Sequence, residues 1–395
     1  FLPKLKSLGI LAVDVMKKQI YFDNAATTKV DEKVVKEMLP YFTEKYGNAS
    51  SQHFKGQEAK EALEKSRKII AKTINAKTHE IIFTSGGTES NNLALKGLAF
   101  QNHPDKDHII TTKIEHDCIL KTCGWLEKHS TRITYLDVDK QGFVNPEDIK
   151  NAITEKTFLV SIIHGNNEIG TIQDLEKIGK ICKEKNVLFH TDACQSFTKT
   201  EINVKKHNLD LVTLNAHKIH GPKGIGALYI RDGIKINPTA HGGGHERNLR
   251  SGTENIPGIV GFAKAVEIAN SKNIKNMEKL RDYLIEKLLE IPNVKLNGPK
   301  EKRLCNNINI SFHNIEGESI GGYLENEGIC TSTGSACMSN TLSSSHVLKA
   351  IGLEPVDQNS SLRISISKYT TKEEIDYFLQ KLKPVVEKLR RISPL

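Results

Sequence analysis

Two segments of the sequence place reactive side chains directly after runs of apolar residues. Lys218 follows "LDLVTLNAH", and Asp192 ends "NVLFHTD". A lysine removed from water at the end of a buried strand has a lowered pKa and can form a Schiff base with a carbonyl compound. A carboxylate in the same crevice can keep a pyridinium nitrogen protonated, as pyridoxal phosphate requires when it acts as an electron sink. Taken singly, however, most lysines are surface charges, and an aspartate in this position is commonly a cap or turn residue.

The segment "TSGGTESNN", residues 84–92, adds a candidate phosphate site. Two glycines allow close backbone approach, and the start of the helix that we expect here presents free N–H groups and a positive dipole end. Gly87 and Thr88 are the expected donors, and Thr88 and Ser90 are of the residue types that cap helices. A glycine turn before a helix proves little alone, but it gains meaning beside a Schiff-base lysine and an acidic strand end.

A third chemical feature is a cysteine in a polar segment, Cys337 in "TSTGSACMSN". A segment rich in glycine, serine and threonine offers few contacts that would fix it in a core. The thiolate form of cysteine is a strong nucleophile. The sequence therefore raises the question of which reaction needs a thiol held in this way.

Alternating strands and helices must position these side chains. Apolar runs end in polar clusters at "EIIFTSGG", "HIITTKIEHDC", "TFLVSIIHGNNEIG", "NVLFHTDACQS" and "LDLVTLNAHK", with helical patterns between them. This order predicts a mainly parallel, doubly wound α/β sheet, in which ligands bind at the carboxyl ends of the strands. After about residue 265 the pattern changes to a smaller α+β domain. We expect an N-terminal extension (1–15), a large domain (28–265) and a small domain (16–27 and 266–395) that carries Cys337.

Length and composition are consistent with this division. A chain of 395 residues exceeds what one core usually serves, and no run approaches the eighteen apolar residues of a membrane helix. The net charge of +9 comes from scattered lysines, so we expect no direct nucleic-acid binding. Seven cysteines without C-x-x-C spacing favour neither disulfides nor a metal site, and they indicate a reducing, cytoplasmic location. If residues 1–15 are the remnant of a targeting segment, the alternative is a mitochondrial-type organelle.

From about residue 20 to the C-terminus, the sequence resembles the cysteine desulfurases of the NifS/IscS type. These are fold-type I pyridoxal 5'-phosphate (PLP) enzymes of the class V aminotransferase family. The resemblance rests on ordered motifs: "YFDNAATT", "GGTESNN", "EHDC", "NNEIG", "TDACQS", "AHKIHGPKGIGALYI", "GGGHERNLRSGTEN" and "STGSAC". It implies a fold-type I PLP-dependent transferase fold.

The resemblance also implies a role for each matching residue. Lys218 would form the Schiff base with PLP, Asp192 would pair with the pyridine nitrogen, and His116 would stack on the ring and shuttle protons. The other implied cofactor contacts are Gly87, Thr88, Asn167, Gln195, Asn215 and His217, with Thr253 reaching the phosphate of the neighbouring subunit in a homodimer. Asn167 and Arg363 would bind the substrate, with Arg363 gripping its carboxylate at two points. Cys337 would accept sulfur as a persulfide.

The implied activity is a cysteine desulfurase, which converts L-cysteine to L-alanine and leaves a persulfide on Cys337. Its sulfur would pass to an iron–sulfur scaffold protein or another acceptor, such as a carrier for tRNA thiolation. Selenocysteine lyase or another class V PLP enzyme is the alternative activity, and an inactive assembly partner is the alternative from outside the enzymes. An aminotransferase would not need Cys337, whereas selenium leaves with less help than sulfur, so a lyase is harder to exclude.

Three positions depart from the family pattern. Asn215 stands where a serine is more common, and Gly87 stands where an alanine is more common. Cys194 adds a second thiol beside Gln195. We expect these differences to affect cofactor affinity and thiol reactivity rather than the reaction itself.

Overall fold

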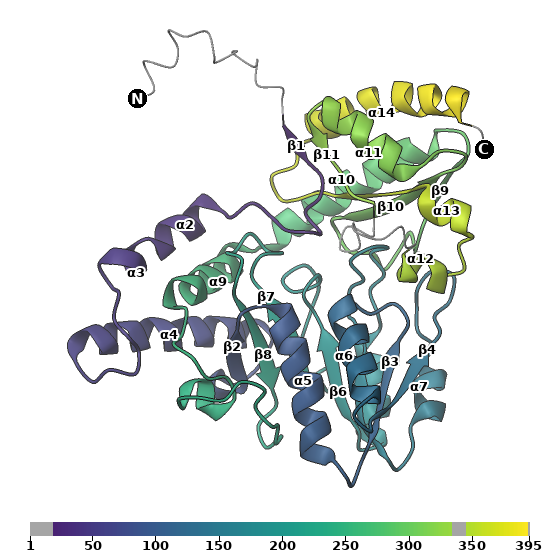
Figure 1. Ribbon diagram of the computed structural model, residues 1–395. Helices are drawn as coiled ribbons and strands as arrows, with labels where there is room; N and C mark the ends of the chain where they lie inside the picture. The colour runs from purple at the N-terminus through teal and green to yellow at the C-terminus, as the bar shows by residue number, and fades with distance from the viewer. Residues whose placement is uncertain (1–18, 334–344, 394–395) are drawn as a thin grey trace.

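The computed structural model describes residues 19–333 and 345–393, which form a larger α/β unit and a smaller unit stacked upon it (Figure 1). In the described residues, none of the helices combines the length and the apolar character that a membrane crossing demands. The expected Cys337 lies outside the described residues.

A seven-stranded sheet, in the order β2-β8-β7-β6-β5-β3-β4, forms the centre of the larger unit. The strands are β2 (Ile81–Thr84), β3 (His108–Thr112), β4 (Arg132–Leu136), β5 (Thr157–Ser161), β6 (Leu188–Asp192), β7 (Leu211–Asn215) and β8 (Gly226–Ile230). From β7 to β4 all neighbours are parallel, whereas β8 is antiparallel to both β7 and β2. Every strand of this sheet except β8 therefore ends at the same edge.

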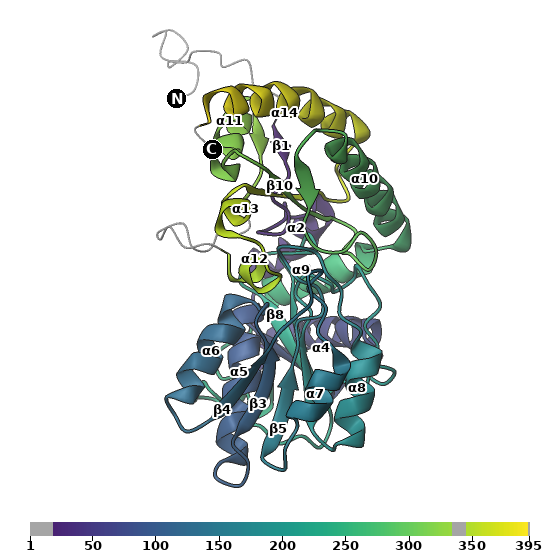
Figure 2. The same cartoon turned by 90° about the vertical axis from the view of Figure 1, so that its right-hand side faces the viewer.

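Helices cover both faces of the sheet, because successive strand residues point to opposite faces and both sets are apolar. Within β2, Ile81 and Phe83 belong to the core under one layer of helices, and Ile82 belongs to the core under the other. Figure 2 shows these two layers edge-on. The first layer contains α4 (Phe54–Thr73), α7 (Pro146–Ala152), α8 (Leu175–Glu184) and α9 (Ile256–Ile268), with α2 (Glu32–Met38) packed on α9. The second layer contains α5 (Gly87–Asn102) and α6 (Asp117–Glu127).

The smaller unit has its own apolar core around a three-stranded antiparallel sheet, β12-β10-β9. Its elements are β9 (Val294–Leu296), β10 (Asn307–Phe312), β12 (Ser361–Ser365), α10 (Ser271–Leu289), α11 (Gly317–Asn326) and α14 (Lys372–Ile392). The N-terminal strand β1 (Ile20–Tyr21) joins this unit by pairing in parallel with β11 (Ile329–Cys330). Phe22 packs edge-on against Phe378 of α14, with ring centroids 5.6 Å apart. Both ends of the described chain thus contribute to one core.

Short elements complete the structure. They are α3 (Pro40–Thr43), α12 (His346–Ala350), α13 (Pro355–Asn359) and the 3₁₀ turns η1 (Thr78–Glu80) and η2 (His245–Asn248). The core residues of α12 pack against residues that follow β3 and β5, and this contact joins the smaller unit to the carboxyl edge of the large sheet.

The predicted α/β class with a mainly parallel sheet is confirmed. The expectation that Thr88 and Ser90 cap α5 is wrong. The cap is Gly86, whose φ of 154° favours glycine. Because glycine has no side chain, this cap makes no side-chain hydrogen bond. Ser90 instead lies in the first turns of α5, with its hydroxyl 2.7 Å from that of Thr84.

Candidate active site

The carboxyl edge of the large sheet gathers most of the predicted functional side chains. Lys218 lies three residues beyond the end of β7, and its Nζ donates hydrogen bonds to the carbonyl oxygens of Ala25 and Ala26, the latter at 2.6 Å. These carbonyls belong to the "YFDNAATT" segment, which arrives from the N-terminal strand. The amine is therefore held between the large sheet and the segment leading to the smaller unit.

Asp192 ends β6 as a buried carboxylate, 4% exposed. Its Oδ1 accepts the backbone N–H of Cys194 at 2.9 Å, and its Oδ2 accepts the side-chain amide of Asn91 at 2.7 Å. The neighbouring Gln195 donates from Nε2 to the carbonyl oxygen of Ala25, 2.8 Å away. Lys218, Asp192 and Gln195 thus converge on one locality, from β6, β7 and the N-terminal segment.

His116 caps the N-terminus of α6, where its Nδ1 accepts the backbone N–H of Cys118 at 3.2 Å. The thiol of Cys118 also lies 3.1 Å from this nitrogen. Burial lowers the pKa of His116, and the positive charge of Lys218 lowers it further against the opposing effect of Asp192. The imidazole is therefore neutral at physiological pH.

A cleft at the N-terminus of α5 has the features of an anion site. It is lined by residues of the α5 first turn and of the segment around His217, among them Thr27, Gly86, Gly87, Thr88, His217 and Lys223. The first turn of a helix leaves N–H groups without intrahelical acceptors, and these groups attract an anion. Burial lowers the pKa of His217 to about 4, with Lys218 and Lys223 acting in the same direction. Neutral His217 can therefore serve as a hydrogen-bonding group in this cleft.

Gly87 and Asn215 fit closely together in this region. A Cβ atom added to Gly87 would lie 2.5 Å from Sγ of Cys194 and 3.7 Å from Nδ2 of Asn215. Asn215 is 3% exposed, and its Oδ1 has no hydrogen-bond partner among the described residues. Gly87 and Cys194, which both depart from the family pattern, therefore pack against each other.

Arg363 and Asn167 lie on the side of the site that faces the smaller unit. Arg363 is 4% exposed on β12 and pairs through Nη2 with Asp23 Oδ1 at 2.9 Å. Its Nη1 donates to the backbone oxygen of Asn167 at 3.3 Å, and its Nε is buried without a partner among the described residues. A guanidinium with an unused donor at this place can receive a carboxylate.

The loop that carries Thr253 begins from a strained segment. Glu246, Arg247 and Asn248 have positive φ angles of 44°, 57° and 64°, a conformation that non-glycine residues seldom adopt in succession. Glu246 is held there by two bonds to Arg67, at 2.7 and 2.8 Å. Its Oε2 also accepts the backbone N–H of Phe83, 2.7 Å away.

Thr253 is exposed and does not line the cleft at α5 of its own chain. Arg250, three residues earlier, pairs with Glu89 of the α5 first turn at 2.9 Å. The structure thus brings together every predicted site residue in the described part of the chain except Thr253. Cys337, in the segment between Thr333 and Ser345, is not described.

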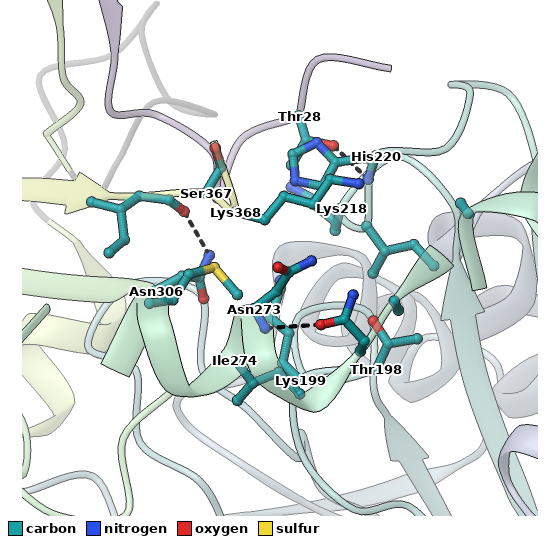
Figure 3. Close-up of a pocket in the computed structure, with 16 residues that line it drawn as sticks. Thr28, Thr198, Lys199, Lys218, His220, Asn273, Ile274, Asn306, Ser367 and Lys368 are labelled. Atoms are coloured by element: carbon teal, nitrogen blue, oxygen red, sulfur yellow. Dashed lines mark hydrogen bonds between the residues drawn. The ribbon is translucent and has the colours of Figure 1, made fainter. Parts of the chain in front are cut away.

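Behind Lys218, a second cavity lies between the two units (Figure 3). Lys199 and Lys218 both line it, facing Asn273 of α10 and Lys368 from beyond β12. Lys199 donates to the carbonyl oxygen of Gln195 at 2.9 Å, and burial lowers its pKa to about 8. Besides Lys218, the cavity therefore contains an amine, that of Lys199, with a lowered pKa.

Sequence reasoning missed two residues of the site. Asn91 lies within the motif "GGTESNN", four residues after Gly87, and this helical spacing was the available signal. Asp23 lies within "YFDNAATT", but no local pattern predicts its ion pair with a residue 340 positions away.

Comparisons with known proteins agree with this geometry. The sequence profile of the family "Aminotransferase class-V" matches residues 20–378. A "Cysteine desulfurase IscS" from Dictyoglomus turgidum is 50% identical over 383 residues, covering 96% of this chain and 97% of the relative. One of the same name from Methanosarcina thermophila is 50% identical over 386 residues, covering 97% and 96%.

Two solved structures extend the comparison. One described as "NIFS-LIKE PROTEIN" superposes with a TM-score of 0.89 at 43% identity, covering 94% of this chain and 100% of that one. Another, "SspA in complex with cysteine", has a TM-score of 0.80 at 40% identity, covering 89% and 100%. The similarity in sequence and structure extends across both units.

Proposed function

We infer that this chain, which belongs to the aminotransferase class-V family, is a cysteine desulfurase that uses PLP. Its curated relatives of nearly equal length carry that activity in their names. The observation that carries the proposal is the arrangement of Lys218 and Asp192 beside the anion cleft at α5. A Schiff-base amine, a buried carboxylate and a phosphate cradle are the three groups that PLP needs.

The residues present fit this cofactor. The first turn of α5, with Gly87, Thr88 and neutral His217, would hold the phosphate. The amide oxygen of buried Asn215 has no hydrogen-bond partner among the described residues, and the amide nitrogen would be the donor to the phosphate. Because Gly87 has no Cβ, Sγ of Cys194 can pack against the backbone at the start of α5. When bound, PLP supplies an electron sink for the charge that develops at Cα of the amino acid substrate.

The remaining site residues position and exchange protons. Lys218 would provide the amine that holds the cofactor, and its Nζ would move the proton at Cα of the substrate. Asp192 would pair with the ring nitrogen, Gln195 would bond the ring hydroxyl, and Asn167 would bond the ring hydroxyl or the substrate. His116 would stack on the ring as a neutral imidazole.

Arg363 would bind the carboxylate of L-cysteine. Its pairing with Asp23 orients the guanidinium, and its buried Nε remains available as a donor. A charge-assisted bond of this kind is about twice as strong as a neutral one. Substrate binding therefore joins β12 of the smaller unit to the large sheet.

Cys337 is the proposed sulfur acceptor, on the strength of the "STGSAC" motif. Its thiolate attacks the substrate sulfur, the Cβ–S bond breaks, and the two electrons of that bond remain on the carbon side. Protonation there completes L-alanine, and the sulfur stays on the enzyme as a persulfide. Atoms and electrons balance without an external oxidant. An iron–sulfur scaffold or another sulfur carrier is the proposed recipient.

A homodimer is the proposed assembly, with Thr253 reaching the partner's phosphate site. Four large apolar side chains on the N-terminal helical segment support it, because they are more than half exposed: Leu39, Phe42, Tyr46 and Phe54, at 57%, 58%, 67% and 74%. An exposed apolar group of this size is typical of a protein interface. The separate cores of the two units support the proposed domains (28–265, and 16–27 with 266–395). The cytoplasm remains the proposed location.

The test is to reduce the purified protein with borohydride and map the labelled peptide, while alanine and sulfide are measured with L-cysteine as substrate. The cofactor should be fixed to Lys218. Lys199 is the informative competitor, because burial lowers its pKa and it lines the same cavity as Lys218. Label on Lys199, or no alanine from L-cysteine, would overturn the assignment.

A further inference from the structure

A continuous chain of hydrogen bonds joins Asp192 to His116 through two residues of unassigned role. Asn91 of α5 donates one amide hydrogen to Asp192 Oδ2 at 2.7 Å, and its Nδ2 lies 3.1 Å from Sγ of Cys118. That sulfur lies 3.1 Å from Nδ1 of His116. The chain therefore crosses from β6 through α5 to the start of α6.

Counting donors fixes the direction of each bond. Nδ1 of His116 accepts the backbone N–H of Cys118, so this nitrogen carries a lone pair and the ring proton resides on Nε2. The thiol next to the same lone pair is then the donor in its contact with His116. Its sulfur in turn accepts the second amide hydrogen of Asn91. The hydroxyl of Thr88 is a further donor to this sulfur.

We propose that Cys118 and Asn91 are positioning residues, which hold His116 as a neutral imidazole protonated on Nε2 and join it to Asp192. With Nδ1 occupied by two donors, His116 exchanges protons with bound molecules through Nε2 alone. The inference deepens the proposed function, on which the catalytic meaning of His116 rests, but the hydrogen-bond chain exists independently of it.

The surroundings of His116 favour the same state. The charged and titratable groups that act on it are Asp192 on β6, Lys218 beyond β7, Asp117 on α6 and His346 on α12. Burial and the cations outweigh the two carboxylates, and the pKa of His116 is lowered. Burial also raises the pKa of the Cys118 thiol to about 12, so this thiol keeps the proton that it donates.

The test uses the full-length protein with ¹⁵N-labelled histidine, with the His116 signals assigned by their loss in His116→Gln. In the unmodified protein at pH 8, Nδ1 should give the shift of an unprotonated acceptor and Nε2 that of a protonated nitrogen. Cys118→Ala removes a donor to Nδ1, so the Nδ1 shift should move toward that of a free lone pair. Because the lost bond favoured the neutral ring, the titration midpoint should rise by about half a pH unit. Cys118→Ser keeps a donor and should hold the midpoint at or below the original value.

Matched variants separate positioning from packing. Cys123→Ala removes the same atom from a buried position on the same helix and should leave the His116 signals unchanged. Asn92→Ala is the control for Asn91→Ala, because Asn92 bonds the backbone of Thr88 instead. Protonated Nδ1 in the unmodified protein, or unchanged His116 signals in Cys118→Ala, would overturn the proposal, as would an equal change in Cys123→Ala. Alanine formation from L-cysteine, measured on the same samples, tests the proposed function separately.

Discussion

Replacing Gly87 with alanine would test the fit between the first turn of α5 and Cys194. The new Cβ would lie 2.5 Å from the cysteine sulfur, whereas non-bonded heavy atoms settle at about 3.5–4.0 Å. An overlap of this size in packed surroundings costs about 1–3 kcal/mol. The lower figure applies if Cys194 turns about χ1, and the upper figure applies if the start of α5 moves.

Because α5 also forms the phosphate cradle, part of this strain should reduce cofactor affinity. A loss of about 1–3 kcal/mol corresponds to a rise of roughly 5- to 150-fold in the PLP dissociation constant. The assay combines denaturant unfolding of the apoprotein with PLP titration, so that the sum of both losses is measured. Gly322→Ala in α11 is the matched control, since no atom lies within 4 Å of its added Cβ. It should stabilise the protein by about 0.5–1 kcal/mol.

The decisive comparison is the double variant. Cys194→Ala removes the sulfur, so Gly87→Ala should then cost little, and the two changes should show a coupling of about 1 kcal/mol or more. If their effects simply add to within about 0.3–0.5 kcal/mol, the steric reasoning is wrong. Restored affinity in the double variant would also explain why a glycine and a cysteine occur together here.

Three further outcomes follow from the site and its supports. Cys337→Ser should retain PLP absorbance and the spectral response to L-cysteine, yet lose sulfide release and the persulfide, because serine is a far weaker nucleophile toward sulfur. Mass spectrometry of the 331–340 peptide measures the persulfide, and full turnover in this variant would refute the role of the "STGSAC" motif. Glu246→Gln removes the buried carboxylate that pairs with Arg67 and leaves only the partly exposed Glu64 as its ion-pair partner. The protein should lose about 3–5 kcal/mol of stability, measured by denaturant unfolding, and a loss below about 1 kcal/mol would contradict the tethering of this segment. Burial lowers the pKa of His190 to about 4, so the folded state binds fewer protons than the unfolded state. The stability that depends on neutral His190 is complete above about pH 6.5 and falls by up to about 3 kcal/mol toward pH 4; denaturant unfolding across this range should show a flatter acid limb in His190→Gln, and an unchanged limb would contradict the assignment.

The sequence predicts the edge of the sheet well, because parallel strands end together and their apolar runs are easy to recognise. Lys218, Asp192 and His116 each stand at or after the end of such a run, so the sequence alone predicts that these side chains lie close together. The edge strand β4 escaped notice, because its residues are mostly half-buried or exposed and carry no continuous apolar run.

Contacts between distant side chains could not be predicted in this way. Arg67 and Glu246 are 179 positions apart, and neither stands in a pattern that names the other. Asn91 stands in a recognisable motif, but its bridging contact requires α5 and α6 to be in place. The helix cap was also misjudged, because α5 begins after a glycine in a positive-φ conformation and has no side-chain capping bond.

The pairing of Asp23 with Arg363 has a consequence for synthesis on the ribosome. The two residues are 340 positions apart, so at about 5–20 residues per second the N-terminal segment waits about 17–70 s for its partner. The sheet of the larger unit is complete by Ile230, whereas the core around Phe22 cannot close before β12 has emerged. A nascent chain therefore carries an apolar N-terminal strand unburied for most of its translation, which makes this strand a natural binding site for chaperones. A chain released before β12 would hold Lys218 on a finished sheet but would lack the arginine proposed to bind substrate.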